Sequence, residues 1–145
     1  MESGGSVRDT ARAMSEEKLD LILEGFERFE AGELDFERFW HENGVLTAPE
    51  GWPEQGPFEG REAIRAQFER LGVDYAETRF TDVQMLAEQG EWVVVRFTWR
   101  TRGLASDIET AADMAAAHRV KDGRFLEAHY RWHAEDALEA AGLSE

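Results

Sequence analysis

Two polar side chains in the C-terminal half of the chain, His118 and Tyr130, are of types that can move a proton. Each lies in a stretch where apolar and polar residues alternate with a period of two, which predicts a strand, and the alternation turns both side chains inward. An imidazole can serve as a general base near neutral pH, and a phenol can donate a hydrogen bond to a developing oxyanion. The alternative is a core histidine and tyrosine that are satisfied by each other or by the backbone.

The other histidines do not have the spacing of a metal site. His129 and His133 are four residues apart, which would suit a helix, but in a strand this spacing separates them by about 13 Å. His41 has no close partner in sequence. The chain has no cysteine, which excludes disulfides, thiolate zinc sites and cysteine nucleophiles. We therefore expect neither a metal nor another cofactor.

The first half of the chain is predicted to be mainly helical. Residues 1–14 are rich in glycine, serine and charge, and we expect a flexible segment there, followed by a single domain over residues 15–145. Ser15 is a suitable N-cap for a first helix, which Gly32 ends. Asp35 can cap a short second helix, and a third helix follows a loop rich in glycine and proline.

After Gly72 the hydrophobic period changes from 3.6 to 2. The pattern predicts one short early strand, four later strands and a final short helix, at about 45–47, 77–87, 92–102, 107–121, 125–133 and 134–141. Three helices with one early strand, followed by an antiparallel meander, indicate an α+β fold. In this fold a strongly curved, mostly antiparallel sheet packs on the three N-terminal helices.

Several short motifs resemble those of the nuclear transport factor 2-like superfamily and, within it, of the SnoaL-like, polyketide cyclase-like branch. They are Ala31-Gly32-Glu33-Leu34-Asp35, Trp40, Phe58-x-Gly60-x-x-Ala63-Ile64, His118-Arg119-Val120-Lys121-Asp122-Gly123-Arg124 and Ala140-Ala141-Gly142-Leu143. In this order they span about Ser15 to Leu143. The resemblance implies a cone-shaped, cystatin-like fold with a pocket at one end, most often in a dimer. It does not select one activity, because members include cyclases, ketosteroid isomerases, epoxide hydrolases and non-catalytic binders.

The residues expected for a ketosteroid isomerase are missing. The resemblance implies a carboxylate just before the proline that ends the first strand, but Ala48 precedes Pro49. The oxyanion-donor position falls near Ala116 and the tyrosine position near Gly25, so only Glu50 could replace the base. An epoxide hydrolase would need an arginine inside the pocket, and the arginines of the strand at 92–102 lie on the face opposite its apolar residues.

In the SnoaL-like families a late-strand aspartate or histidine acts as the base, and His118 is the residue in this chain that matches that role. The carboxylate usual at the end of the last strand is replaced by His133. Asp113 belongs to the outward face unless a bulge shifts it.

The pocket is expected to be hydrophobic and to bind a bulky apolar or aromatic compound. Small residues around Met114, such as Ala116, leave space for a ligand; the alternative is close contact with a helix or a partner subunit. Trp52, in the glycine- and proline-rich loop, is expected to contact the ligand or cover the mouth with Glu50. The remaining expected ligand-binding residues are Phe26, Trp40, Ile64, Phe68, Val95, Phe97, Trp99 and Trp132.

Charge and hydropathy limit the partners. With 16 basic and 31 acidic residues the net charge is 16 − 31 = −15, so the chain is acidic, and binding to nucleic acid or an anionic membrane is disfavoured. No apolar run approaches the roughly 20 residues that span a bilayer, and the N-terminus lacks a signal-peptide pattern, so we expect a cytoplasmic protein. We also expect a homodimer through an outer sheet face that carries Trp92, Val94, Thr98, Phe125 and His129 beside several arginines.

The sequence thus predicts a small-molecule pocket of SnoaL-like type, with proton-transfer chemistry of the cyclase or isomerase kind at His118. The alternative is a non-catalytic domain that binds a ligand or a partner through the same cone. The surroundings of His118 distinguish the two. A hydrogen-bonded imidazole open to the pocket favours an enzyme, and one sealed by side chains favours the binding domain.

Overall fold

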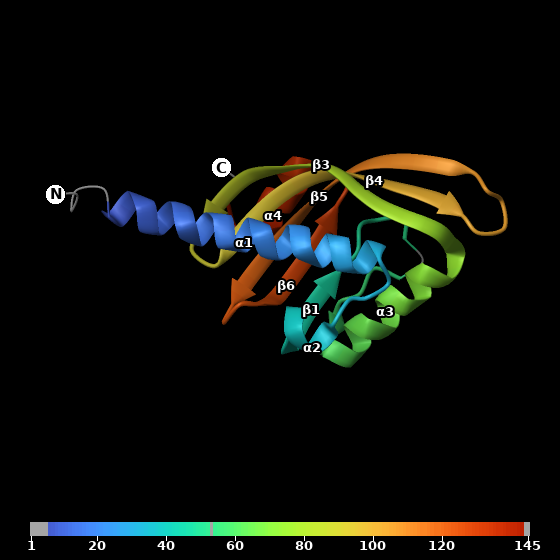
Figure 1. The fold of residues 1–145 in the computed structure, drawn as a ribbon, viewed down its shortest axis with the longest axis horizontal. Coiled ribbons are helices and arrows are strands. Elements are labelled where there is room, and N and C mark those ends of the chain that lie inside the picture. Colours follow the sequence, from blue (N-terminus) through green and yellow to red (C-terminus); the bar gives the residue numbers. More distant parts are fainter. Residues whose placement is uncertain (1–5, 53, 144–145) are drawn as a thin grey trace.

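The fold is a single curved sheet with one long helix lying across its inner face (Figure 1). A computed structural model describes residues 6–52 and 54–143, and the side chains among them except those of residues 6–15 and 72–74. The elements are α1 (Ser6–Glu30), α2 (Phe36–Phe39), β1 (Trp40–Thr47), β2 (Phe58–Glu59), α3 (Arg61–Asp74), β3 (Tyr75–Gln89), β4 (Trp92–Gly103), β5 (Glu109–Lys121), β6 (Arg124–Arg131) and α4 (Ala134–Ala140). The predicted α+β class is confirmed.

The sheet has the strand order β2-β1-β6-β5-β4-β3. β3 to β6 form the predicted antiparallel meander, and the early strand β1 joins it parallel to β6, with Leu46 beside Ala128 and Thr47 beside His129. β1 begins at Trp40, earlier than predicted, and Gly60, with φ of +94°, precedes α3 as its N-cap. This conformation is one that glycine adopts without strain.

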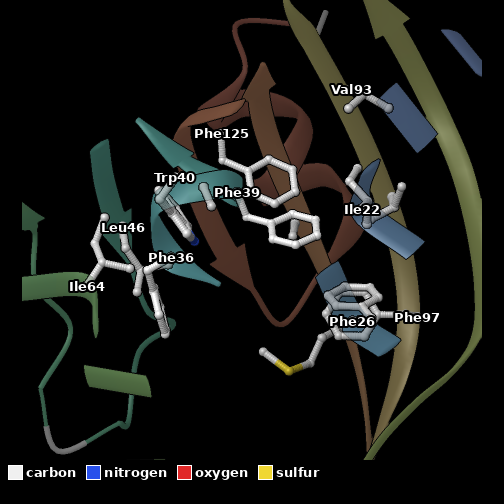
Figure 2. Packing of buried hydrophobic residues seen from close by; sticks show 14 of the residues in the cluster. Ile22, Phe26, Phe36, Phe39, Trp40, Leu46, Ile64, Val93, Phe97 and Phe125 are labelled. Atoms are coloured by element: carbon white, nitrogen blue, oxygen red, sulfur yellow. The ribbon is translucent and has the colours of Figure 1, made fainter. Parts of the chain in front are cut away.

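The alternation of inward and outward residues on β4 and β5 is as predicted. Val95 and Phe97 lie in the main core beside Ala116 and Met114, their neighbours on β5. Ala115 and its outward neighbours belong to a second, separate cluster. Figure 2 shows the main core, in which side chains from α1, α2, β1, α3 and the later strands meet.

The helices bury aromatic side chains against this inner face. On α1, Phe26 stacks on Phe80 of β3, with ring centroids 4.2 Å apart, and lies 5.1 Å from Phe97. Asp35 caps α2 as predicted, because its carboxylate accepts hydrogen bonds from two backbone N–H groups of the first turn. The N-cap predicted at Ser15 was wrong, since α1 already begins at Ser6.

The β5–β6 pair contains a register shift that moves one aromatic ring inward. Arg119 pairs with Glu127, whereas the next residue, Val120, pairs with Phe125. The extra residue on β6 reverses the alternation, and Phe125 is 5% exposed in the main core, next to Trp40. The prediction that Phe125 lies on the outer face was therefore wrong.

The outer face of the sheet is partly covered by α4. Ala137 and Ala141 pack there against Ala115, Ala117 and Val94. For the alanines on this face of β5, close contact with a helix is thus the reason for their small size. Of the described helices, none is long and apolar enough to cross a membrane.

Candidate functional site

Between the helices and the inner face of the sheet lies a small cavity of about 40 Å³. Its walls come from α1, α3, β1, β3 to β6 and the loop after β1, and they are almost entirely apolar. Six residues expected in the site line it, namely Trp52, Phe68, Phe97, Trp99, Met114 and Tyr130. A second cavity of about 30 Å³ shares Tyr130 and three phenylalanines with the first, and it also contacts Phe26, Trp40 and His118.

Trp52 is half-buried and lines the first cavity. Its ring stacks on Trp99, with centroids 5.3 Å apart and planes 29° apart, and Tyr75 meets Trp99 edge-on. The indole N–H of Trp99 is buried without a hydrogen-bond partner among the described residues. The loop that carries Trp52 is also held by Trp132, whose indole N–H donates to the backbone carbonyl of Glu50 at 2.7 Å.

His118 lines the second cavity. It is 2% exposed, its ring centroid is 5.0 Å from that of Phe125, and its Nδ1 has no partner among the described residues. Burial, with a smaller contribution from the charge of His129, lowers the pKa of His118 to about 3. The imidazole is therefore neutral at any pH near 7.

Tyr130 meets His118 edge-on at 5.8 Å between ring centroids and separates the two cavities. Burial raises the pKa of the phenol above its ordinary value, so Tyr130 keeps its proton near neutral pH. The pair consists of two neutral groups that can donate and accept hydrogen bonds in an apolar enclosure. It does not contain a group poised to change its charge near neutral pH.

Several expected ligand-binding residues are not at the cavities. Ile64, Val95 and Ala116 are fully buried in the core and line neither cavity. Glu50 is exposed and faces a groove on the outside of the molecule. Trp132 packs against the core and borders another outer groove.

Other lining residues escaped the sequence-based selection. Gln67 of α3 is 6% exposed and lines the first cavity, and its side-chain oxygen accepts a hydrogen bond from Arg70 at 2.8 Å. It lies three residues after Ile64, on the same helix face, and this spacing could have identified it. Phe29 lines both cavities and belongs to the apolar stripe of α1, while Phe80 of β3 also lines both. Among the described residues, no group of three or more His, Asp or Glu side chains could hold a metal ion.

Comparison with known proteins identifies the family. The model of the SnoaL-like domain matches residues 22–128. Among curated proteins, no relative matches the chain. Similar solved structures include Bal32a from a soil-derived mobile gene cassette, with 21% identity, 87% of this chain and 96% of the other covered, and a TM-score of 0.70.

Two further structures share the fold at lower identity. A candidate polyketide cyclase from Xanthomonas campestris is 16% identical over 83% of this chain and 93% of its own, with a TM-score of 0.68. TerC, co-crystallised with polyporic acid, is 19% identical over 85% of this chain and 98% of its own, with a TM-score of 0.65. The family model covers most of the chain and the structures share its architecture, so the protein belongs to the SnoaL-like domain family.

Proposed function

We propose that the cone binds a flat, largely apolar small molecule and holds it by stacking, without changing it chemically. The observation that carries this proposal is the Trp52–Trp99 stack over an apolar cavity. A flat ligand could take the place of Trp52 on the face of Trp99 and keep most of the contact that the two rings make. Aromatic faces of this kind provide a large buried area with a defined orientation.

The cavity must enlarge before such a ligand can enter. A volume of about 40 Å³ is far below the roughly 300 Å³ of small-molecule pockets. The loop after β1 is the part best able to move, because Glu50, Gly51 and residues 54–57 are exposed, although Ala48 and Pro49 at its start are buried. Its tip is tied by the backbone hydrogen bond from Ala48 to Gln55 and the exposed ion pair between Arg70 and Glu54. We propose that Trp52 swings outward with this loop.

Three neutral polar groups can recognise the ligand inside. Tyr130 and Gln67 border the first cavity, and His118 borders the second. A ligand oxygen that reaches the junction of the two cavities could accept from the Tyr130 hydroxyl. We therefore propose a planar compound with one or two phenol or carbonyl oxygens. The crystallisation of TerC with the small molecule polyporic acid is consistent with this ligand class.

Proton transfer of the cyclase type is the second candidate function. It is favoured by the similarity to a candidate polyketide cyclase and by the closeness of Tyr130 to His118. The pKa of about 3 weighs against it, because a general base works best when its pKa is near the working pH. Within the described part of the chain, the buried Nδ1 of His118 also lacks a partner that would orient the ring. The surroundings of His118 thus support the binding domain better than the enzyme.

The test is a calorimetric titration of the protein with a neutral hydroxyanthraquinone. Leu71→Trp fills the first cavity and should abolish binding, while Leu138→Trp, on α4 at the outer face, should leave it unchanged. Binding that survives Leu71→Trp, or that both variants lose equally, would contradict the proposal.

The enzyme candidate has its own readout. If His118 moves protons, carbon-bound hydrogen next to a carbonyl of the bound compound should exchange with deuterium, and His118→Gln should stop the exchange. Binding without such exchange supports the non-catalytic function.

We also propose that two copies pair through the part of the outer sheet face that α4 leaves open. Arg96, Thr98 and Asp113 lie there beside one another. Light scattering that gives a monomer at micromolar concentration would contradict this.

A further inference from the structure

Four side chains on the outer face form a chain of hydrogen bonds between β1 and β6. The hydroxyl oxygen of Thr47 lies 2.8 Å from Nδ1 of His129, and Nε2 of that ring lies 3.0 Å from a carboxylate oxygen of Glu127. Arg131 donates to the same Thr47 oxygen at 2.8 Å. Thr47 and His129 are 82 residues apart in sequence and become neighbours because β1 pairs parallel to β6.

The donors and acceptors in this chain fix the proton positions. The carboxylate of Glu127 can only accept, so Nε2 of His129 carries the proton of that hydrogen bond. In the neutral imidazole Nδ1 then has a lone pair, so Thr47 donates to His129 while it accepts from Arg131. This assignment follows from the network of partners. The result is a hydroxyl, an imidazole and a carboxylate in the order that activates a nucleophilic oxygen.

Further contacts hold the imidazole of His129 and its partner Glu127 in place. Glu127 accepts from Arg119 at 2.9 Å through its second oxygen, and Arg119 is itself paired with Glu91. Burial alone would raise the pKa of Glu127, but the hydrogen bonds from His129 and Arg119 outweigh it and lower the pKa below its ordinary value. Trp92 stacks on the imidazole with centroids 6.0 Å apart. The His129 side chain is 13% exposed.

A groove of about 630 Å³ opens beside the hydroxyl. Thr47 and Arg131 line it together with the loop after β1 and α4. Thr47 and Ala48 stand between this groove and the first cavity and line both, whereas Arg131 and α4 line the groove and neither cavity of the cone. Glu50, Asp136 and Glu139 stand along the groove, and their charges favour a neutral or cationic molecule over an anion.

We propose that this groove is a second site, in which Thr47 takes up the acyl group of a small neutral or cationic carboxylic ester. The Thr47 oxygen forms a bond to the carbonyl carbon while its proton passes to Nδ1 of His129. The bond from that carbon to the alkoxy oxygen then breaks, and His129 gives the proton to the leaving alcohol. Arg131, which already donates to the Thr47 oxygen, stands close enough to stabilise the negative charge of the intermediate.

Water completes the reaction. It attacks the acyl carbon and gives a proton to His129, the bond to the Thr47 oxygen breaks, and the proton returns to that oxygen. The sum is an ester and water giving an acid and an alcohol, with no oxidant or metal required.

The experiment uses the whole chain with p-nitrophenyl acetate, with release of p-nitrophenolate followed by absorbance and the acetyl group located by mass spectrometry of peptides. We expect acetylation of Thr47. Thr47→Val and His129→Asn should lower the rate on the order of 100-fold. Thr98→Val is the matched control, because Thr98 lies on the same sheet face and donates to a carboxylate, Asp113, with no imidazole. It should leave the rate unchanged.

A second variant guards against loss of folding. Thr47→Ser keeps the hydroxyl and the link between β1 and β6, and it should be acetylated at least as fast as the wild type. Absence of acetylation in both the wild type and Thr47→Ser would overturn the proposal, and the four side chains would then only join the two strands. Acetylation that His129→Asn leaves unchanged would overturn it as well. Neither result depends on whether the cone binds a ligand.

Discussion

The two histidines on neighbouring strands, His118 on β5 and His129 on β6, have opposite surroundings. His118 faces the inner side of the sheet, 2% exposed, with Nδ1 unpartnered among the described residues. His129 faces the outer side, with both ring nitrogens paired to Thr47 and Glu127. The same side chain is thus part of the apolar wall of a cavity in one place and the centre of a polar network in the other. Solvent exposure and hydrogen-bond partners, rather than residue type, therefore decide what a histidine side chain can do.

The largest effect is expected from a charge placed at the inner position. His118→Lys would put an ammonium group among the buried rings of Phe125 and Tyr130, at a cost of about 3–5 kcal/mol of the free energy of unfolding. Urea denaturation measures it. His133→Lys, at an exposed residue, is the control and should change little. A His118→Lys variant as stable as the wild type would mean that water reaches the inner end of the cone.

Acid should destabilise the fold through the inner histidine. The pKa of His118 falls from 6.5 in the unfolded chain to about 3 in the fold, so between these values the unfolded state binds more protons. The stability present above pH 6.5 is therefore lost as the pH falls toward 3, by a few kcal/mol in all. Unfolding by urea at pH 7 and pH 5 measures the first part of this loss, above the range where Glu127 titrates.

His118→Leu should remove this slope between pH 7 and pH 5, because leucine binds no proton. His129→Leu serves as the matched control and should retain the slope. An unchanged slope in His118→Leu would show that another group is responsible.

Replacing each histidine by leucine should change the free energy of unfolding at pH 7 by a smaller amount, which differs between the two positions. His129→Leu removes one hydrogen-bond partner from each of Thr47 and Glu127 and should cost about 1–3 kcal/mol. His118→Leu removes a buried nitrogen that has no partner among the described residues, so it should be neutral or stabilising by up to about 1 kcal/mol. Thermal unfolding of both variants in parallel checks the prediction. Equal losses would mean that His118 has a partner that the described residues do not supply.

The smallest effect, on ligand affinity, is expected from removing the hydroxyl oxygen of Tyr130. Tyr130→Phe should weaken binding of a hydroxyanthraquinone about tenfold, which corresponds to one lost hydrogen bond in an apolar site. Calorimetric titration measures the affinity. Thr98→Val, which removes a hydroxyl from the outer face, is the control. No change in Tyr130→Phe would place the polar end of the ligand elsewhere.

Much of the inner wall could be predicted because it depends on local pattern. Trp52, Phe68, Phe97, Trp99 and Met114 were expected at the site, and all line the first cavity. Apart from Trp52, which the loop after β1 carries, their inward direction follows from alternation along a strand or from the face of a helix. Ile64, Val95 and Ala116 also point inward, yet they line neither cavity. Sequence periodicity separates inward from outward residues, but it cannot separate the wall of a cavity from a filled core.

The amino-acid sequence by itself determined the class of fold, the order of its elements and the facing of β4 and β5, because these follow from periods of 2 and 3.6 along the chain. The tertiary structure alone decided where Phe125 points, since a bulge reverses the alternation, and why Ala115 is small, since α4 packs on it. It also brought Thr47 to His129 by pairing β1 with β6. Contacts between distant segments depend on the register and packing of the whole sheet, and no local pattern encodes them.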